Sequence, residues 1–343
     1  MRQSPDFSPS GANLEVPRAV RTAPDGVLAI DKPLGITSHD VVARLRRLAG
    51  TRKVGHAGTL DPAASGVLVA GIGRGTKLLQ YLQGQRKTYV TRVCFGVETD
   101  SEDAEGSITA TRGATLAELD HLESSLACWR GPVMQIPSAF SALKIRGKRA
   151  ADRIRAGEEI RMEPRPVTIY ELVALGEPQA GELAGVGVVY QDLKVTCSAG
   201  TYIRALGRDL GNQLGVGAHL VALRRLAVGA FTADGAKTSA SSPAYSLAEL
   251  AEIVNTGKEL PVYSLDQVCR QIFPTCQVTA EVLTSLAYGQ RPEIAYETYE
   301  ELGKEDFDIA GKVYALHLSG GVISRLASPV EGKWRSVLSL QSS

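Results

Sequence analysis

Apolar positions recur along the chain with two periods, which predict alternating strands and helices from residue 26 onward. Residues 26–31 form a short apolar run, typical of a buried strand. A helix is predicted to follow, capped at its N-terminus by Thr37 and Ser38. Its apolar residues keep the three- and four-residue spacing of one helix face, namely Val41, Val42, Leu45 and Leu48.

Similar patterns predict further helices and strands in the middle of the chain. A second helix is expected to begin at Thr76. Residues 87–97 alternate between apolar and polar, which predicts a strand buried on one face only. Residues 99–106 form an acidic turn, which we interpret as a solvated hairpin tip. A strand at 193–197 and a helix at 203–214 follow.

Breaks in the pattern suggest the domain organisation. Residues 1–24 are rich in Ser, Pro and Arg and are predicted to be a flexible extension. A Ser- and Ala-rich break at 239–244 precedes a short helix and a linker near Pro261. Beyond about residue 268, short strands and Gly-rich turns predict a small, mainly β region. The expected fold class is mixed α/β.

Composition narrows the class of protein. With 343 residues, 44% hydrophobic and 22% charged, the chain has the make-up of a globular protein and excludes collagen or wholesale disorder. It opens with no signal segment, and no apolar run is long enough to cross a bilayer, which predicts a cytoplasmic protein without membrane attachment. Five scattered cysteines without a Cys-x-x-Cys pair also fit a reducing compartment.

The net charge of +1 conceals an asymmetry. Residues 1–240 carry 30 Lys and Arg against 24 Asp and Glu, a net charge of +6, and residues 241–343 carry 8 against 13, a net charge of −5. Basic residues cluster at 44–53 and 144–165. Such clusters are what binding to a phosphate backbone requires. A solvated helix face is the alternative for either cluster taken alone.

Three motifs that resemble functional sites do not qualify. Ser38, His39 and Asp40 are adjacent on a predicted helix, so their side chains cannot face one another as a triad. Residues 71–77 are Gly-rich but fit neither the dinucleotide pattern nor the P-loop spacing. The five histidines show no metal-ligand spacing, so neither a metal nor a nucleotide cofactor is expected.

The loop at 52–68 is the strongest candidate site. It reads RKVGHAGTLDPAASGVL, with three glycines, two basic residues and one acid, Asp61. An Asp-Pro in a Gly-rich loop is commonly a turn. Here the glycines permit close approach by a ligand, and a lone carboxylate among basic neighbours could act on a phosphate-bearing substrate.

The motif GHAGTLDPAASG closely resembles the catalytic loop of the TruB family, the bacterial tRNA pseudouridine-55 synthases. Other segments resemble that family in the same order and spacing, over residues 26 to 230. They are AIDKPLGITSHDVV (29–42), KTY (87–89), GVETDSEDAEG (96–106), QIPSAFSALKIRGKRA (135–150), CSAGTYIRALGRDLG (197–211) and GAHLVALRRLAV (217–228). The tail resembles, more weakly, a PUA-type RNA-binding domain.

The resemblance implies roles for individual residues. Asp61 corresponds to the essential aspartate, Tyr89 to an aromatic that stacks on the target base and could move a proton, and Arg204 to the partner of Asp61. The remaining implied substrate-binding residues are His56, Tyr202, Leu223, Lys32 and Lys144. The chain departs from the family pattern at Phe140 and Ala151, where tyrosines are usual in the thumb loop, and at Ser65, where a threonine is usual.

The implied architecture is a pseudouridine synthase fold, with a mixed, largely antiparallel sheet, flanking helices and a thumb insertion near 135–165. Residues 25–265 would be the catalytic domain and 266–343 a PUA-like RNA-binding domain. The implied activity is isomerisation of uridine 55 in the T-arm of tRNA, by a monomer that needs neither cofactor nor protein partner. Two alternatives remain open at this point: an RNA-folding protein with the same fold, and a guide-RNA-dependent pseudouridine synthase.

Overall fold

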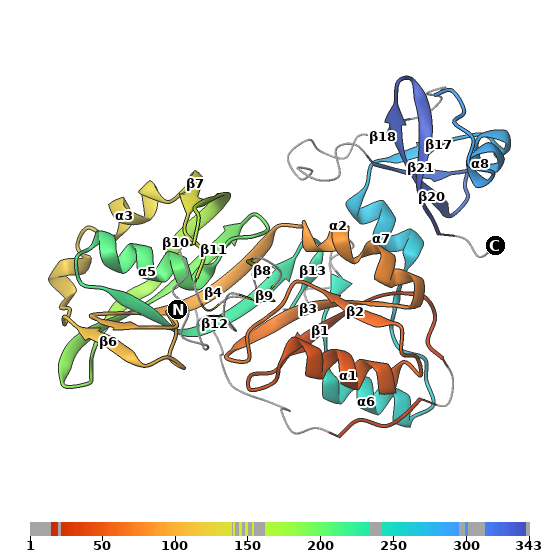
Figure 1. Ribbon diagram of the computed structural model, residues 1–343. Helices are drawn as coiled ribbons and strands as arrows, with labels where there is room; N and C mark the ends of the chain where they lie inside the picture. Colours follow the sequence, from red (N-terminus) through yellow and green to blue (C-terminus); the bar gives the residue numbers. More distant parts are fainter. Residues whose placement is uncertain are drawn as a thin grey trace. The chain divides into compact units, whose positions relative to one another are not determined.

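The computed structural model describes residues 15–19, 22–138, 140, 144–145, 148–149, 153, 162–233, 242–294, 299–300 and 313–340. The chain forms two compact units (Figure 1). Among the described residues, unit 1 comprises 63–65 and 86–226, and unit 2 comprises the others.

Unit 2 is built around two long antiparallel strands, β1 (Gly26–Lys32) and β3 (Ala64–Ile72). Strand β2 (Val54–Ala57) pairs with β3, and the short strands β15 (Tyr245–Ser246) and β16 (Tyr263–Ser264) pair with β1. Every residue of β3 is buried, so this part of the sheet is covered on both faces. The expected strand at 26–31 is therefore confirmed as a central one.

Different helices cover the two faces. Helices α1 (Ser38–Leu48) and α6 (Leu247–Asn255) pack on the face that carries Leu28 and Ile30. The opposite face, with Val27 and Ala29, packs against α2 (Leu79–Gln83) and α7 (Leu265–Ile272). The side chains of a strand alternate between its faces, so one short apolar run supplies both cores.

Helix α1 is confirmed with its predicted inward residues. Thr37 is its N-cap, and Thr37 and Asp40 form a capping box in which each side chain binds the other's backbone N–H. Two hydrogen bonds from Thr37 hold the pKa of the Asp40 carboxyl below its usual range.

The second helix begins later than expected. A 3₁₀ helix spans Gly73–Leu78 and runs directly into α2. The glycines here allow close packing, because a Cβ on Gly75 would lie 1.8 Å from the carbonyl oxygen of Gly26. The missing side chain therefore lets the backbone at Gly75 pack directly against that of Gly26.

Unit 1 contains a sheet whose strands run in the order β12 (Ala218–Val228), β4 (Lys87–Phe95), β11 (Val186–Cys197), β10 (Arg165–Leu183) and β7 (Gly131–Gln135). Within it, β4 pairs with β11, β11 with β10 and β10 with β7, each pair antiparallel. The helices α3 (Leu122–Cys128) and α5 (Ile203–Gln213) pack on one face. A 3₁₀ helix at Leu116–Leu119 adds Leu119 to the same core.

The strand expected at 87–97 is confirmed as β4, Lys87–Phe95, but the expectation that only one of its faces is buried was wrong. Tyr89 and Phe95 belong to the core beneath the helices, as expected. On the opposite face Val90 and Cys94 are buried too. Cys94 lies in a second apolar cluster with Val97 and Val188, which also packs against partly buried residues of β10, β11 and β12. A local alternation could not show this, because the covering residues come from a later part of the chain.

The hairpin of β5 (Val97–Thr99) and β6 (Ile108–Thr111) corrects a second expectation. Its tip is not wholly solvated, because Glu102 and Asp103 are only 8% and 9% exposed. Both carboxylates pair with arginines of α5, which replace the lost water. Asp100 and Glu105 are exposed, as predicted.

The C-terminal region is the small β structure that was expected. Its sheet has the order β18 (Tyr299–Glu300), β17 (Thr275–Gln277), β19 (Tyr314–His317), β20 (Ile323–Val330) and β21 (Lys333–Ser339). Helix α8 (Ala280–Ala287) packs against a core that includes the fully buried Trp334. Short strands β13 (Phe231–Thr232) and β14 (Ser242–Pro243) precede it in the chain.

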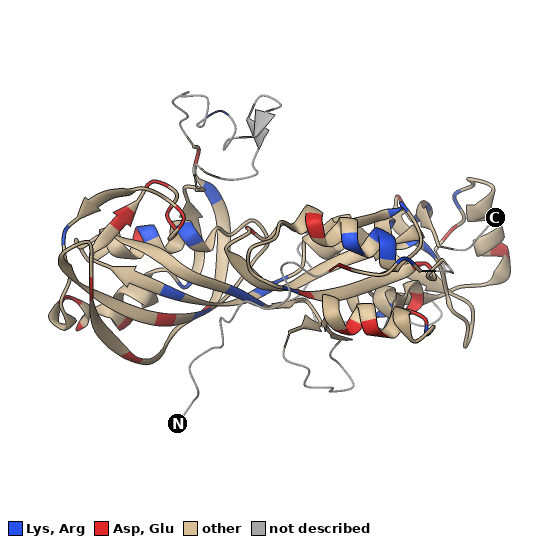
Figure 2. Cartoon of the chain, turned by 90° about the horizontal axis from the view of Figure 1, so that it is seen from below, with Lys and Arg blue, Asp and Glu red and all other residues tan. Residues whose placement is uncertain are grey.

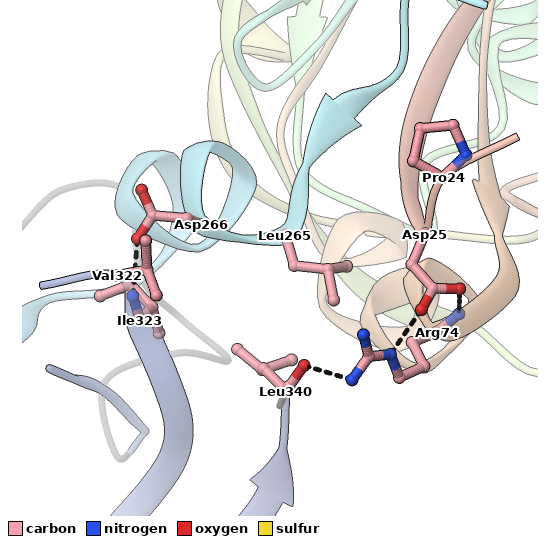
Figure 3. A pocket seen from close by; sticks show the side chains of 8 residues that line it. All are labelled: Pro24, Asp25, Arg74, Leu265, Asp266, Val322, Ile323 and Leu340. Atoms are coloured by element: carbon pink, nitrogen blue, oxygen red, sulfur yellow. Dashed lines mark hydrogen bonds and ion pairs between the residues drawn. The ribbon is translucent and has the colours of Figure 1, made fainter. Parts of the chain in front are cut away.

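Polar contacts join this C-terminal region to the N-terminal part of unit 2 (Figure 3). Arg74 donates hydrogen bonds to the Asp25 carboxylate and to the carbonyl oxygen of Leu340. On the other side of a cavity of about 600 Å³, Asp266 accepts a hydrogen bond from the Ile323 amide. Helix α7 therefore belongs to both the sheet's core and this contact.

Candidate active site

The loop that carries Asp61 connects β2 to β3 in unit 2. Its two neighbours in sequence are both anchored. The Leu60 amide donates to Ser38 Oγ at 2.9 Å, and Ser38 Oγ donates to the Leu60 carbonyl at 3.0 Å. The Gly35 amide donates to the Pro62 carbonyl at 2.9 Å. Asp61 is itself half-buried, and these contacts fix its backbone on either side.

Ser38 is a functional candidate that the sequence did not reveal. The cap of α1 is made by Thr37 and Asp40, which leaves the Ser38 hydroxyl for the loop. Ser38 is 1% exposed, so both of its hydrogen bonds are shielded from water. A Ser directly after an N-cap has no pattern that distinguishes this role from capping, because the partner lies 22 residues away.

We expect Ser38→Ala to lower kcat about tenfold. It removes both hydrogen bonds and leaves the buried Leu60 amide without its acceptor, at a cost of about 1–3 kcal/mol. The matched control is Thr37→Ala, which should cost about 1 kcal/mol of stability as a lost cap and leave kcat within about twofold. Steady-state kinetics and thermal unfolding of both variants check this. Equal kcat in the two variants would show that Ser38 does not position the loop.

Two other predicted residues lie in unit 2. His56, in β2, has its ring edge-on to that of His39, with centroids 5.5 Å apart. Lys32, at the end of β1, is fully buried, and its ammonium donates to the carbonyls of Pro33 and Ile36 at 2.9 and 2.8 Å. Lys32 therefore fixes the turn that also carries Gly35, one of the anchors of the Asp61 loop.

The other predicted residues lie in unit 1. Tyr89 is 6% exposed and packs in the core beneath α5. Tyr202 is the N-cap residue of α5, and Leu223 in β12 packs against the same core. The backbone of Lys144 belongs to the hairpin of β8 (Lys144–Ile145) and β9 (Lys148–Arg149), and its side chain lies outside the described residues, as does Ala151.

Arg204 is buried at the start of α5, with 9% of its surface exposed. Its guanidinium donates to the carbonyl oxygens of Ser101 and Phe140, each at 2.9 Å, and pairs with Asp103 at 3.2 Å. Asp61 and Arg204 lie in different units, so their pairing stays a prediction. The departure from the family pattern at Phe140 does not affect the contact seen, because Arg204 binds a backbone oxygen there.

Asp103 is thus a further candidate that sequence analysis assigned to a solvated turn. Its neighbour Glu102 pairs with Arg208 at 2.5 Å. Arg204 and Arg208 are four residues apart on α5 and so lie on one helix face. The sequence contains both the four-residue spacing of the arginines and the two consecutive acids. It does not show that they pair, because only the fold brings the hairpin next to α5.

A buried lysine lies two residues before Tyr89 on β4. Burial, and then the nearby charge of Arg225, lower the pKa of Lys87 to about 8. The same buried group includes Cys197, where burial raises the pKa of the thiol to about 11. Among the described residues no cluster of metal-ligating side chains occurs, and no described helix is long and apolar enough to span a membrane.

We expect the stability of the protein to rise relative to Lys87→Met as the pH rises from 7.5 to 9.5. The folded protein releases the Lys87 proton near pH 8, whereas the unfolded chain keeps it until about pH 10. The unfolded state then binds more protons, so stability rises with pH, by about 2 kcal/mol over this range. Urea unfolding of both proteins at the two pH values measures it. Parallel pH dependences would contradict a depressed pKa at Lys87.

Charged side chains are spread over several elements of both units (Figure 2). The cluster at 44–53 lies at the exposed side and end of α1, where Arg46 and Arg47 also bind backbone carbonyls. Most of the basic cluster at 144–165 lies outside the described residues. Its place at the surface therefore remains a prediction.

Comparison with known proteins matches the chain to one family. Residues 46–203 match the model described as TruB family pseudouridylate synthase (N terminal domain), and residues 204–268 match the one described as tRNA pseudouridylate synthase B C-terminal domain. A protein of Paenarthrobacter aurescens named tRNA pseudouridine synthase B is 46% identical, over 78% of this chain and 80% of its own. A protein of the same name from Streptomyces coelicolor is 44% identical over 86% of this chain and 93% of its own.

Solved structures show the same fold at lower identity. A chain in the crystal structure of a Cbf5-Nop10-Gar1 complex superimposes with a TM-score of 0.63, at 22% identity, over 97% of this chain and 92% of that one. A chain of an H/ACA ribonucleoprotein bound to a substrate RNA containing 2′-deoxyuridine gives a TM-score of 0.62 at 21% identity, over 92% and 85%. The two family models are contiguous, and the relatives are more than 40% identical over three quarters of the chain. The chain therefore belongs to the TruB family of pseudouridylate synthases.

Proposed function

We propose that this protein isomerises uridine 55 in the T-arm of tRNA to pseudouridine, with Asp61 as the essential carboxylate. The observation that carries the proposal is the double anchoring of the Asp61 loop, through Leu60 to Ser38 and through Pro62 to Gly35. A reacting carboxylate must be held in place before the substrate arrives. The names of the relatives, tRNA pseudouridine synthase B, support tRNA as the substrate.

The reaction breaks the N1–C1′ bond of the uridine, turns the base and joins C5 to C1′. A proton leaves C5, and one is taken up at N1. No electrons are gained or lost, so the chemistry calls for no redox cofactor. An ionised carboxylate placed against the sugar or the base acts as nucleophile or as electrostatic partner in this step.

The target base has to leave the helical stack of the T-arm before it can react. Flipping costs a few kcal/mol, and stacking on an aromatic ring returns about 1–3 kcal/mol. Tyr89 is proposed for this stacking, and Arg204 is proposed to pair with Asp61 once the nucleotide is bound. His56, Tyr202 and Leu223 are proposed to line the base pocket, and Lys32 and Lys144 to assist substrate binding.

We assign residues 25–265 to catalysis and 266–343 to a PUA-like RNA-binding domain, with the thumb at 135–165. The protein is proposed to act in the cytoplasm as a monomer, without a guide RNA or an obligate protein partner. The thumb segment lies within residues 46–203, which match the TruB family model, and this supports the stand-alone kind of enzyme.

A tritium-release assay with the purified chain alone tests this proposal. The chain is incubated with a tRNA transcript that carries tritium at C5 of uridine, and with a matched transcript that has cytidine at position 55. The proposal predicts release of one tritium per uridine-55 transcript and none from the matched transcript. Release that requires an added guide RNA would favour the guide-dependent alternative.

The placement of basic residues predicts how tRNA binding depends on salt. We expect Lys144→Gln with Arg146→Gln to reduce the slope of log affinity against log salt by about 1.4–1.8, because each lost phosphate contact removes about 0.7–0.9. The matched pair Lys333→Gln with Arg335→Gln, both exposed on β21, should reduce it less. Binding titrations at four salt concentrations compare the two. A larger loss in the β21 variant would place the main RNA contact on the C-terminal region.

A further inference from the structure

Two arginines of α5 hold two separate segments of unit 1. Arg204 binds Asp103 and the carbonyl of Phe140, and Arg208 repeats this arrangement one helical turn later. The Arg208 guanidinium pairs with Glu102 at 2.5 Å and donates to the carbonyl of Ile136 at 2.8 Å. Each arginine therefore joins one acid of the hairpin Thr99–Gly106 to one backbone oxygen at the start of the thumb.

The described residues at the start of the thumb contact α5 at several points. We call Gln135–Phe140 the thumb anchor. Gln135, 1% exposed, donates to the carbonyl of Tyr202 at 3.0 Å and accepts from the Tyr202 amide at 2.8 Å. Ser138 is fully buried. Successive contacts to Tyr202, Arg208 and Arg204 thus fix Gln135, Ile136 and Phe140 against α5.

The pair of Arg208 and Glu102 is sheltered from water. Their side chains are 25% and 10% exposed. Burial raises the pKa of the Glu102 carboxyl, and Arg208 acts against that rise. Arg208 also donates to Asp209 at 2.8 Å, so its nitrogens serve three acceptors in three directions. Only a planar guanidinium offers such a fork, and a lysine could satisfy fewer of these acceptors at once.

We propose that Arg208, through Glu102 and Ile136, is a positioning residue that holds the described start of the thumb against α5 and thereby sets the affinity for tRNA. It does not touch the reacting atoms. Arg204 and Arg208 lie on one helix face and have different proposed roles. Arg204 is proposed to pair with Asp61, and Arg208 to support RNA binding. The expected effect on tRNA rests on the proposed function, whereas the expected effect on the thumb does not.

The experiment compares Arg208→Gln with a matched control, Arg92→Gln. Arg92 forms a two-point pair with Asp192 at 2.7 and 2.9 Å in the same unit, with side chains 29% and 10% exposed. Both substitutions remove a sheltered Arg–carboxylate pair, and only the first touches the thumb anchor. Arg208→Lys tests rescue by a cation, and Glu102→Gln provides a milder variant should Arg208→Gln fail to fold.

Two readouts are measured on the full-length protein. The first is the rate of trypsin cleavage, without RNA, at the six Lys and Arg of residues 144–155. Arg208→Gln should be cleaved there about tenfold faster than Arg92→Gln. The second is steady-state kinetics with tRNA. KM should rise about tenfold, as expected for loss of a charged hydrogen bond, while kcat changes by less than about threefold.

The outcomes are distinct. Arg208→Lys should fall between the wild type and Arg208→Gln in both readouts, and Glu102→Gln should show the same direction with a smaller size. Cleavage and KM within twofold of Arg92→Gln would overturn the proposal, as would a loss of kcat at unchanged KM. Faster cleavage in a protein with no activity on tRNA would leave the positioning of the thumb intact and reject the proposed function instead.

Discussion

Asp61→Asn is expected to lower the rate of pseudouridine formation by about a thousandfold or more, with little change in tRNA affinity. The substitution keeps the size and most of the hydrogen-bonding capacity of the side chain and removes its charge. Loss of a preorganised charge or of a nucleophile has effects of this order. Single-turnover kinetics with tRNA, together with a binding titration, measure the two quantities separately.

The control for this variant is Asp40→Asn, in the same unit. It removes a carboxylate that caps α1 and does not belong to the Asp61 loop. Asn keeps an acceptor for the Thr37 amide, so we expect only the loss of a charge at the helix N-terminus, about 0.3–1 kcal/mol in stability, and near-normal turnover. If Asp61→Asn still converted uridine at more than a tenth of the wild-type rate, Asp61 would not be the essential carboxylate.

The second large effect is expected at Tyr89. Tyr89→Phe keeps the ring and removes the hydroxyl, and Tyr89→Leu removes both. If the ring only stacks on the base, the Phe variant should be nearly normal and the Leu variant should lose about 10- to 100-fold in kcat/KM, the equivalent of about 1–3 kcal/mol. If the hydroxyl moves a proton, the Phe variant should bind tRNA normally and turn over slowly.

Tyr89 is buried in the core of unit 1, so its truncation also disturbs packing. Phe95→Leu is the matched control, because Phe95 lies on the same strand, the same face and the same core. Both Leu variants should lose stability, and only Tyr89→Leu should lose activity beyond what its unfolding explains. Normal turnover of Tyr89→Leu would exclude both roles.

Local patterns predicted the elements that carry the Asp61 loop. The strand at β1, the helix α1 with its cap, and the helix α5 each depend on residues close together in sequence, so their periodicity sufficed. The Gly-rich loop with its single acid was also visible as a candidate site. Its rigidity was not, because the Ser38 hydroxyl that holds Leu60 belongs to a different element.

The two wrong predictions of solvent exposure, for the hairpin tip and for β4, have the same cause in the tertiary structure. Glu102 and Asp103 looked like solvated acids because nothing near them in sequence is basic, and their partners Arg208 and Arg204 come about 100 residues later. Likewise, β4 looked half-buried because its covering residues belong to β10 to β12. In both cases a second segment changes the solvent exposure that a local pattern assumes.

The measurement that tests the central claim most directly is a map of pseudouridine at nucleotide resolution in an unmodified tRNA transcript. The purified wild-type protein and Asp61→Asn are incubated with the transcript in parallel, with no other protein and no guide RNA. We expect one pseudouridine, at position 55, with the wild type and none with Asp61→Asn. Pseudouridine at another position, none without a guide, or equal conversion by both proteins would contradict it.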